Sequence, residues 1–174
     1  MRFKFLLLIV CIVLSCKGKK DADVVENVKV SEEVEVQADV DLEVYDFEGF
    51  QKFLNRSDDK TYVINFWATW CAPCIKELPY FEKLNADYQN VEVVLVSLDF
   101  PHVYDKKLKP FIIKKELKSK VIALNDPNEN EWINKIDESW SGSIPATIIY
   151  KKDNRKFFER SFTFEELENE VKQF

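Results

Sequence analysis

A short apolar run that leads directly into two closely spaced cysteines constrains the fold of this chain most. Residues 62–67 read Tyr-Val-Ile-Asn-Phe-Trp, a nearly continuous apolar run of the kind expected of a central strand covered on both faces. Thr69-Trp70-Cys71-Ala72-Pro73-Cys74 follows. Apolar residues then recur at helical spacing, at Leu78, Phe81, Leu84 and Tyr88. The sequence therefore predicts a buried strand, a cysteine pair and a helix in immediate succession.

Strand-like and helix-like segments alternate through the rest of a domain predicted at 43–174. Further strands are predicted at 91–98, 121–124 and 146–150, followed by a hairpin turn at 151–155 into 156–159. Helices are predicted at 104–117, 128–136 and 164–174. Thr163 and Glu166 form a capping box for the last helix. This order predicts the α/β class, with a mostly parallel central sheet that is flanked by helices and finished by an antiparallel hairpin.

The first sixteen residues have the pattern of an export signal. Arg2 and Lys4 precede the apolar run 5–14, which as a helix spans about 15 Å, half of a bilayer core. The run ends Val13-Leu14-Ser15-Cys16, which resembles the lipobox of bacterial lipoproteins, where cleavage leaves a cysteine that carries the lipids. We expect a signal peptide over residues 1–16 and lipidation of Cys16. An ordinary signal peptide or an uncleaved anchor are the alternatives.

Residues 17–42 show no pattern of a buried core. Acidic residues dominate the second part of this segment: Asp21, Asp23, Glu26, Glu32, Glu33, Glu35, Asp39 and Asp41. Like charges repel and extend a chain, so we predict a flexible tether here. The net charge of −6 also argues against nucleic-acid binding, which requires a basic face. Lysines at 106–118 alternate with apolar residues, which indicates the solvated face of an amphipathic helix, or alternatively a docking patch.

The position of Cys71 and Cys74 favours redox chemistry over a structural role. A helix start carries partial positive charge and unpaired N–H groups, which stabilise a thiolate and lower the pKa of a thiol. A disulfide between these cysteines closes almost no loop, so it adds little stability and should exchange. We expect Cys71 to attack the substrate and Cys74 to resolve the mixed disulfide. A zinc site needs four ligands, whereas the domain offers no other cysteine and one histidine, His102; no metal or cofactor is predicted.

The segment Asn65–Pro79 together with Ile144-Pro145 resembles the thioredoxin superfamily. Its motif Trp-Cys-x-Pro-Cys-x-x-Glu-x-Pro, residues 70–79, is similar to that of the membrane-tethered, extracytoplasmic ResA/TlpA type of thiol–disulfide oxidoreductase. The resemblance covers about 44–174 and implies a thioredoxin fold with an inserted helix and strand between residues 91 and 124. It also implies that Pro145 is a cis-proline that faces the disulfide and pairs with the substrate chain.

Further residues around the cysteine pair complete the predicted site. The resemblance places Glu77 near the cysteine pair, where burial would raise its pKa and make it a candidate proton acceptor; an exposed helix glutamate is the alternative. Asn65 stands where cytoplasmic thioredoxins hold a buried aspartate and cannot act as a base. Trp70 and Ile144 are expected to meet the substrate. Trp140, in the loop before Pro145, either adds to this surface or packs in the core.

The leading functional hypothesis is an extracytoplasmic reductase of disulfides in exported proteins, with apocytochrome c as one candidate client. Such a protein, on the periplasmic side in a Gram-negative cell, needs a membrane electron donor for its re-reduction, and we expect a monomer. A redoxin-type thiol peroxidase is an alternative, because residues 93–99 and the helix after them resemble that group; Thr69, however, precedes Cys71 by two residues instead of three. A module that binds copper or client chains without turnover is the other alternative. The motif does not fix the reduction potential.

Overall fold

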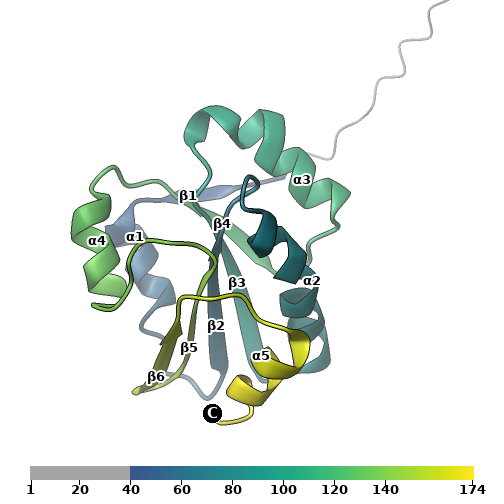
Figure 1. Cartoon of the computed structure of the whole chain (residues 1–174), viewed down its shortest axis with the longest axis vertical. Coiled ribbons are helices and arrows are strands. Elements are labelled where there is room, and N and C mark those ends of the chain that lie inside the picture. Colours follow the sequence, from purple (N-terminus) through teal and green to yellow (C-terminus); the bar gives the residue numbers. More distant parts are fainter. Residues whose placement is uncertain (1–39) are drawn as a thin grey trace, which may run out of the picture. The chain divides into compact units, whose positions relative to one another are not determined.

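A mixed sheet of six strands forms the centre of the computed structural model, which describes residues 40–174 (Figure 1). The strands lie in the order β1-β4-β3-β2-β5-β6. Their bounds are β1 (Glu43–Tyr45), β2 (Thr61–Trp67), β3 (Val91–Ser97), β4 (Lys120–Leu124), β5 (Ala146–Lys151) and β6 (Asn154–Phe158). The predicted signal peptide, Cys16 and the predicted tether up to residue 39 lie outside the described residues.

The strand pairing confirms the predicted mixed sheet. β1, β2, β3 and β4 are mutually parallel where they pair, whereas β5 runs antiparallel to β2 and β6 antiparallel to β5. Every residue of β2 is buried, as its continuous apolar run predicts. The register places Asn65 of β2 opposite Leu95 of β3 and Thr147 of β5. The site residues on β2 are therefore held in the middle of the sheet.

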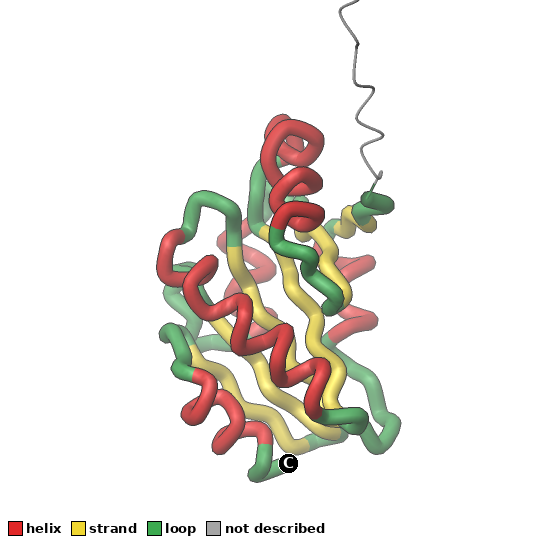
Figure 2. The backbone as a smooth tube through the Cα atoms, turned by 90° about the vertical axis from the view of Figure 1, so that its right-hand side faces the viewer, coloured by secondary structure: helices red, strands yellow, loops and turns green. Residues whose placement is uncertain are grey.

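Helices cover both faces of the sheet and create two cores (Figure 1, Figure 2). On one face lie α2 (Ala72–Asp87), α3 (Lys109–Lys114) and α5 (Phe164–Val171), packed on Trp67, Leu95 and their neighbours. On the other face lie α1 (Phe47–Phe50), α4 (Glu129–Ile136) and the 3₁₀ helix Gln51–Phe53, packed on Ile64 and Phe66. Within residues 40–174, none of these helices is both long and apolar enough to span a bilayer.

The helix predicted at 104–117 consists of two pieces, and a 3₁₀ helix precedes them. A 3₁₀ helix at Pro101–Val103 leads into a π-helix at Tyr104–Leu108, which continues as α3. Pro110 explains the wide turn, since its ring would clash with the carbonyl of Lys106 in a regular α-helix. Lys109 is half-buried. Five other lysines of this region are exposed, as the predicted solvated face requires: Lys106, Lys107, Lys114, Lys115 and Lys118.

Candidate active site

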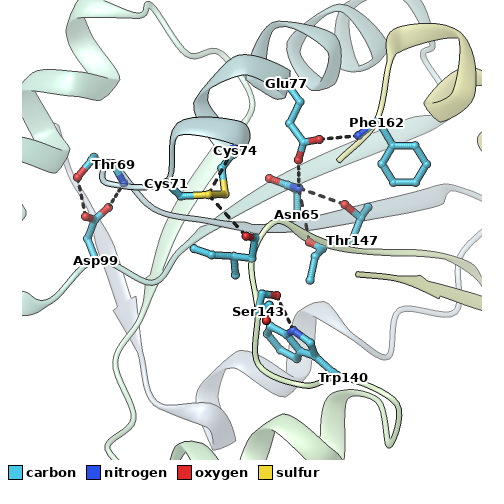
Figure 3. Close-up of a disulfide and its surroundings, with 12 residues drawn as sticks. Asn65, Thr69, Cys71, Cys74, Glu77, Asp99, Trp140, Ser143, Thr147 and Phe162 are labelled. Carbon is cyan, nitrogen blue, oxygen red and sulfur yellow. Dashed lines mark hydrogen bonds between the residues drawn. A yellow bond between two sulfur atoms is a disulfide. The ribbon is translucent and has the colours of Figure 1, made fainter. Parts of the chain in front are cut away.

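The two cysteines of the motif close a disulfide at the start of α2 (Figure 3). β2 ends at Trp67, a short loop follows, and Cys71 is the N-cap residue of α2. The Cα atoms of Cys71 and Cys74 are 5.3 Å apart, and the Cys74 N–H donates to Cys71 Sγ at 3.3 Å. Cys71 keeps 5% of its surface exposed and Cys74 none. The predicted pairing is confirmed, and Cys71 is the sulfur nearer to solvent.

The loop before β5 faces the disulfide through its backbone. The peptide bond between Ile144 and Pro145 is cis, as the resemblance implies. The carbonyl oxygen of Ile144 lies 3.8 Å from Cys71 Sγ, and the Ile144 side chain is half-buried. The loop is therefore placed where the resemblance puts it. That Pro145 and Ile144 contact a substrate chain stays a prediction.

Glu77 lies inside the protein in a network of hydrogen bonds (Figure 3). Its side chain is 1% exposed. One carboxylate oxygen accepts from Asn65 Nδ2 at 3.3 Å, and the other accepts from the Phe162 N–H at 2.7 Å. Desolvation raises the pKa of Glu77 to about 7, although both hydrogen bonds lower it in part. The predicted burial and raised pKa are confirmed, and the alternative of an exposed helix glutamate is wrong.

Asn65 joins this network to the strand that follows the cis-proline. Its Nδ2 also donates to Thr147 Oγ1 at 3.1 Å, across the β2–β5 pairing. The side-chain oxygen of Asn65 is buried and has no hydrogen-bond partner among the described residues. Because an amide carries no charge, the carboxyl of Glu77 is the group of this network that titrates near neutral pH.

Asp99, which the sequence analysis missed, anchors the loop that precedes the cysteines. It follows β3 and is 2% exposed. Its carboxylate accepts from the Thr69 N–H at 2.9 Å, from the Thr69 hydroxyl at 2.6 Å and from the Ser97 hydroxyl at 2.9 Å. Parallel neighbouring strands end at the same edge of a sheet. The signal that could have revealed this contact is therefore an acidic residue directly after the strand that is the neighbour of β2.

The three aromatic and apolar residues predicted to meet substrate have different environments. Trp70 is 62% exposed beside Cys71, which agrees with a surface role. The prediction of a substrate-facing Trp140 is wrong, because its ring is 3% exposed and packs on Phe66 at a centroid distance of 4.8 Å. Its indole N–H donates to the Ser143 carbonyl at 2.8 Å. With its polar atom satisfied inside the loop, the ring fills the core over β2.

His102 is exposed and stacks on Phe100, with ring centroids 5.9 Å apart. It lies in the 3₁₀ helix Pro101–Val103, a surface position as expected. Within residues 40–174, no three histidine, cysteine, aspartate or glutamate side chains come together in a way that could hold a metal ion.

Solved structures of similar fold include a thioredoxin-related protein and a disulfide oxidoreductase. The chain superposes on a thioredoxin-related protein of Neisseria meningitidis serogroup B with a TM-score of 0.57, at 22% identity, over 67% of this chain and 85% of that one. It superposes on a secreted disulfide oxidoreductase of Mycobacterium tuberculosis with a TM-score of 0.52, at 20% identity, over 67% and 84% of the two chains. These likenesses show a thioredoxin-like α/β fold, as predicted.

Sequence relatives agree with this fold. The chain is 32% identical over 113 residues to the thiol-disulfide oxidoreductase ResA of Bacillus cereus (strain ZK / E33L), which is 64% of this chain and 61% of that protein. The matched segments span between 25% and 61% of the lengths of the first curated ResA relatives. The sequence profile of the AhpC/TSA family matches residues 35–155. Since that match takes in the cysteine pair, the cis-proline loop and five of the six strands whole, the chain belongs to the AhpC/TSA family.

Proposed function

We propose that this chain is a thiol–disulfide oxidoreductase whose reacting groups are the sulfurs of Cys71 and Cys74. The observation that carries the proposal is the disulfide at the N-cap of α2, with the Cys74 N–H directed at Cys71 Sγ at 3.3 Å. A helix start stabilises negative charge, so it favours the thiolate of Cys71 when the disulfide opens. The name of the ResA relatives supports the same activity.

The proposed reduction transfers two electrons to the client disulfide, whose two sulfurs leave as thiolates and take up their protons from water. The Cys71 thiolate attacks one sulfur of a client disulfide, which forms a mixed disulfide and releases the other client sulfur as a thiolate. Cys74 then loses its proton and attacks Cys71 Sγ, which releases the second client thiolate and restores the Cys71–Cys74 disulfide. Glu77 is the proposed acceptor of the Cys74 proton, because it is buried three residues along the same helix and its pKa is about 7.

We also propose the direction and the setting of the reaction. In this proposal the chain reduces disulfides of exported proteins, among them apocytochrome c as a candidate, as a monomer outside the cytoplasm. Lipidated Cys16 tethers it to the membrane, and a membrane electron donor re-reduces it. The sequence pattern of an export signal at residues 1–16 supports this setting, as does the description of a similar M. tuberculosis protein as secreted.

A redox titration followed by an insulin assay tests the activity. We expect the purified chain to show a thiol-linked, two-electron transition and to accelerate insulin reduction by dithiothreitol. Cys71→Ser should abolish the acceleration, whereas Cys74→Ser should accumulate mixed disulfides with clients, because the resolving thiol is missing. A chain with no thiol-linked change under oxidant and reductant would contradict the proposal.

The same preparation separates the alternatives. A thiol peroxidase would consume peroxide and oxidise its thiols as it does so. The Thr69 hydroxyl argues against this alternative, because it donates its hydrogen bond to Asp99 at 2.6 Å and not to a cysteine. A module that only binds copper or clients would leave insulin reduction at the uncatalysed rate, and its Cys71→Ser variant would still bind the ligand.

A further inference from the structure

Two exposed aromatic rings line a cleft that begins at the residue before Cys71. Trp70 directly precedes Cys71 and is 62% exposed; Phe100 directly follows Asp99 and is 58% exposed. Both rings line a cleft of about 490 Å³ that reaches to α3, within the range of ligand sites. We call it the basic cleft and define it by Trp70, Phe100, His102, Lys107, Phe111 and Lys114. Exposed aromatic rings of this kind are the usual anchors of a protein contact.

The charge of the basic cleft is opposite to that of the whole chain. Lys107 and Lys114 are exposed, and neither forms an ion pair or hydrogen bond with another residue of 40–174. The carboxylate in the lining, Asp99, is buried, and its oxygens accept from Thr69 and Ser97. In a chain with a net charge of −6, the surface beside the disulfide is thus locally positive.

A second cleft shares Trp70, Asp99 and Phe100 with the first and continues to α4. Its charged lining residues are acidic: Asp126 is half-buried, with its carboxylate held by the N–H groups of Phe47 and Asn128, and Glu129 is exposed. The sign of the surface charge therefore changes across Trp70 and Phe100. A bound chain that crosses these rings meets lysines in one cleft and carboxylates in the other.

We propose that the basic cleft binds an acidic segment of the client protein, immediately beside the client's reacting cysteine. The proposal rests on the function proposed above and adds a feature of its substrates. Thr69 and Trp70 line the basic cleft and directly precede Cys71. A client whose sulfur reacts at Cys71 therefore has its neighbouring residues next to the basic cleft. Lys107 and Lys114 then attract carboxylates, while Asp126 and Glu129 repel them on the other side. Acidic residues are accordingly favoured on one side of the client cysteine only.

Three cystine-linked peptides of equal length test the proposal. One has Gln-Gln on both sides of its cysteine, the second has Glu-Glu before the cysteine, and the third has Glu-Glu after it. The pre-reduced full chain reduces each peptide in a single turnover. Each rate is divided by the rate with dithiothreitol, which attacks as a thiolate as Cys71 does, so that the intrinsic reactivity of the peptide disulfide cancels. We expect one of the two Glu peptides to be reduced about fivefold faster than the Gln peptide at low salt, and the advantage to shrink at about 0.5 M salt.

Two charge-reversal variants identify the surface responsible. Lys107→Glu/Lys114→Glu should lose the advantage of the Glu peptide and keep the rate with the Gln peptide. Lys106→Glu/Lys118→Glu changes the net charge equally at exposed lysines outside the cleft lining, and it should keep the advantage.

Three results would overturn the proposal. The first is that neither Glu peptide is reduced faster than the Gln peptide. The second is that the advantage survives Lys107→Glu/Lys114→Glu. The third is that this variant reduces the Gln peptide faster than the unmodified chain does. Acidic residues of the chain itself would then be what occupies the basic cleft in the unmodified protein. Failure to reduce any of the peptides would instead count against the proposed function.

Discussion

Glu77 has a buried environment that is unlike that of an ordinary surface glutamate. The carboxyl is buried beside β2 and receives hydrogen bonds from Asn65 and Phe162, yet desolvation outweighs them and raises its pKa to about 7. A carboxyl with this pKa is half protonated at neutral pH, so it can both take up and release a proton there. The buried thiol of Cys74 lies one helical turn away in α2.

Glu77→Gln should slow disulfide reduction at about pH 7 by tenfold or more, since general-base contributions run from about 10²-fold upward. The rise of the rate through about pH 7 should also disappear from the pH profile. Stopped-flow reduction of a model disulfide between about pH 5 and pH 9 checks both. The matched control is Glu82→Gln, a half-buried carboxylate on the same helix that bonds to the Lys118 and Ser119 N–H groups. An unaltered pH profile in Glu77→Gln would exclude the proposed role.

For single residues, the sequence predicts the surroundings of those that belong to the cysteine motif. It does not predict the surroundings of residues that pack against segments distant in the sequence. Cys71, Cys74 and Glu77 have fixed spacings within one helix, so their neighbourhood follows from local geometry. Trp140 packs against Phe66 of β2, Trp132 of α4 and Phe157 of β6. No periodicity within its own loop indicates that three separate elements meet over its ring, which is why its burial was left open.

Among the elements, the segment at the end of β3 is hydrogen-bonded to the loop between β2 and α2. The link is Asp99, whose carboxylate accepts two hydrogen bonds from Thr69 and one from Ser97. Thr69 precedes Cys71 by two residues, so the position of the N-cap depends on a contact made by the neighbouring strand. Buried donors that lose such an acceptor cost about 1–3 kcal/mol.

Asp99→Ala should therefore lower the free energy of unfolding by about 1–3 kcal/mol and reduce the rate of disulfide exchange. Urea unfolding and the insulin assay measure the two effects. Ser97→Ala is the control, because it removes the hydrogen bonds between Ser97, the last residue of β3, and Asp99, and it leaves both contacts between Asp99 and Thr69. It should lose only about 0.5–1.5 kcal/mol and keep the exchange rate. If the two variants lose activity equally, the contact with the loop has no separate role.

The long elements were predictable and the short or irregular ones were not. β2, β3 and β5 are apolar runs buried on both faces, which composition alone reveals. β1 has three residues and α1 has four, too few for a period to be recognised. The π-helix at Tyr104–Leu108 arises because Pro110 interrupts the regular hydrogen-bond pattern, although the lysine spacing indicated one continuous helix.

For the whole molecule, one buried carboxyl couples the redox site to stability. Glu77 packs in the core between β2, α2 and the segment that leads to α5. Its pKa in the folded state, about 7, lies above the ordinary glutamate value of 4.5, so the folded protein binds more protons than the unfolded chain between these pH values. Stability from this group is complete below about pH 4.5 and is lost as the pH rises through about 7.

We expect the free energy of unfolding of the oxidised chain to fall by on the order of 3 kcal/mol from about pH 4.5 to pH 7. Half-buried Glu159 and exposed Glu166 have pKa values lowered by hydrogen bonds from Ser141 and from Thr163, so they change the stability only below this pH window. Urea unfolding at several pH values gives the slope. Glu77→Gln should flatten it, and an equal slope in that variant would assign the effect to other groups.

The N–H of Cys74 points at Cys71 Sγ while the two sulfurs are still joined. When negative charge develops on Cys71 Sγ, the N–H dipole of Cys74 that stabilises this charge is therefore already aligned, and the backbone does not have to rearrange first. In an aqueous thiol, by contrast, water has to reorient around each new charge. In the proposed reaction, a helix cap that forms once, during folding, thus lowers the reorganisation energy of each turnover.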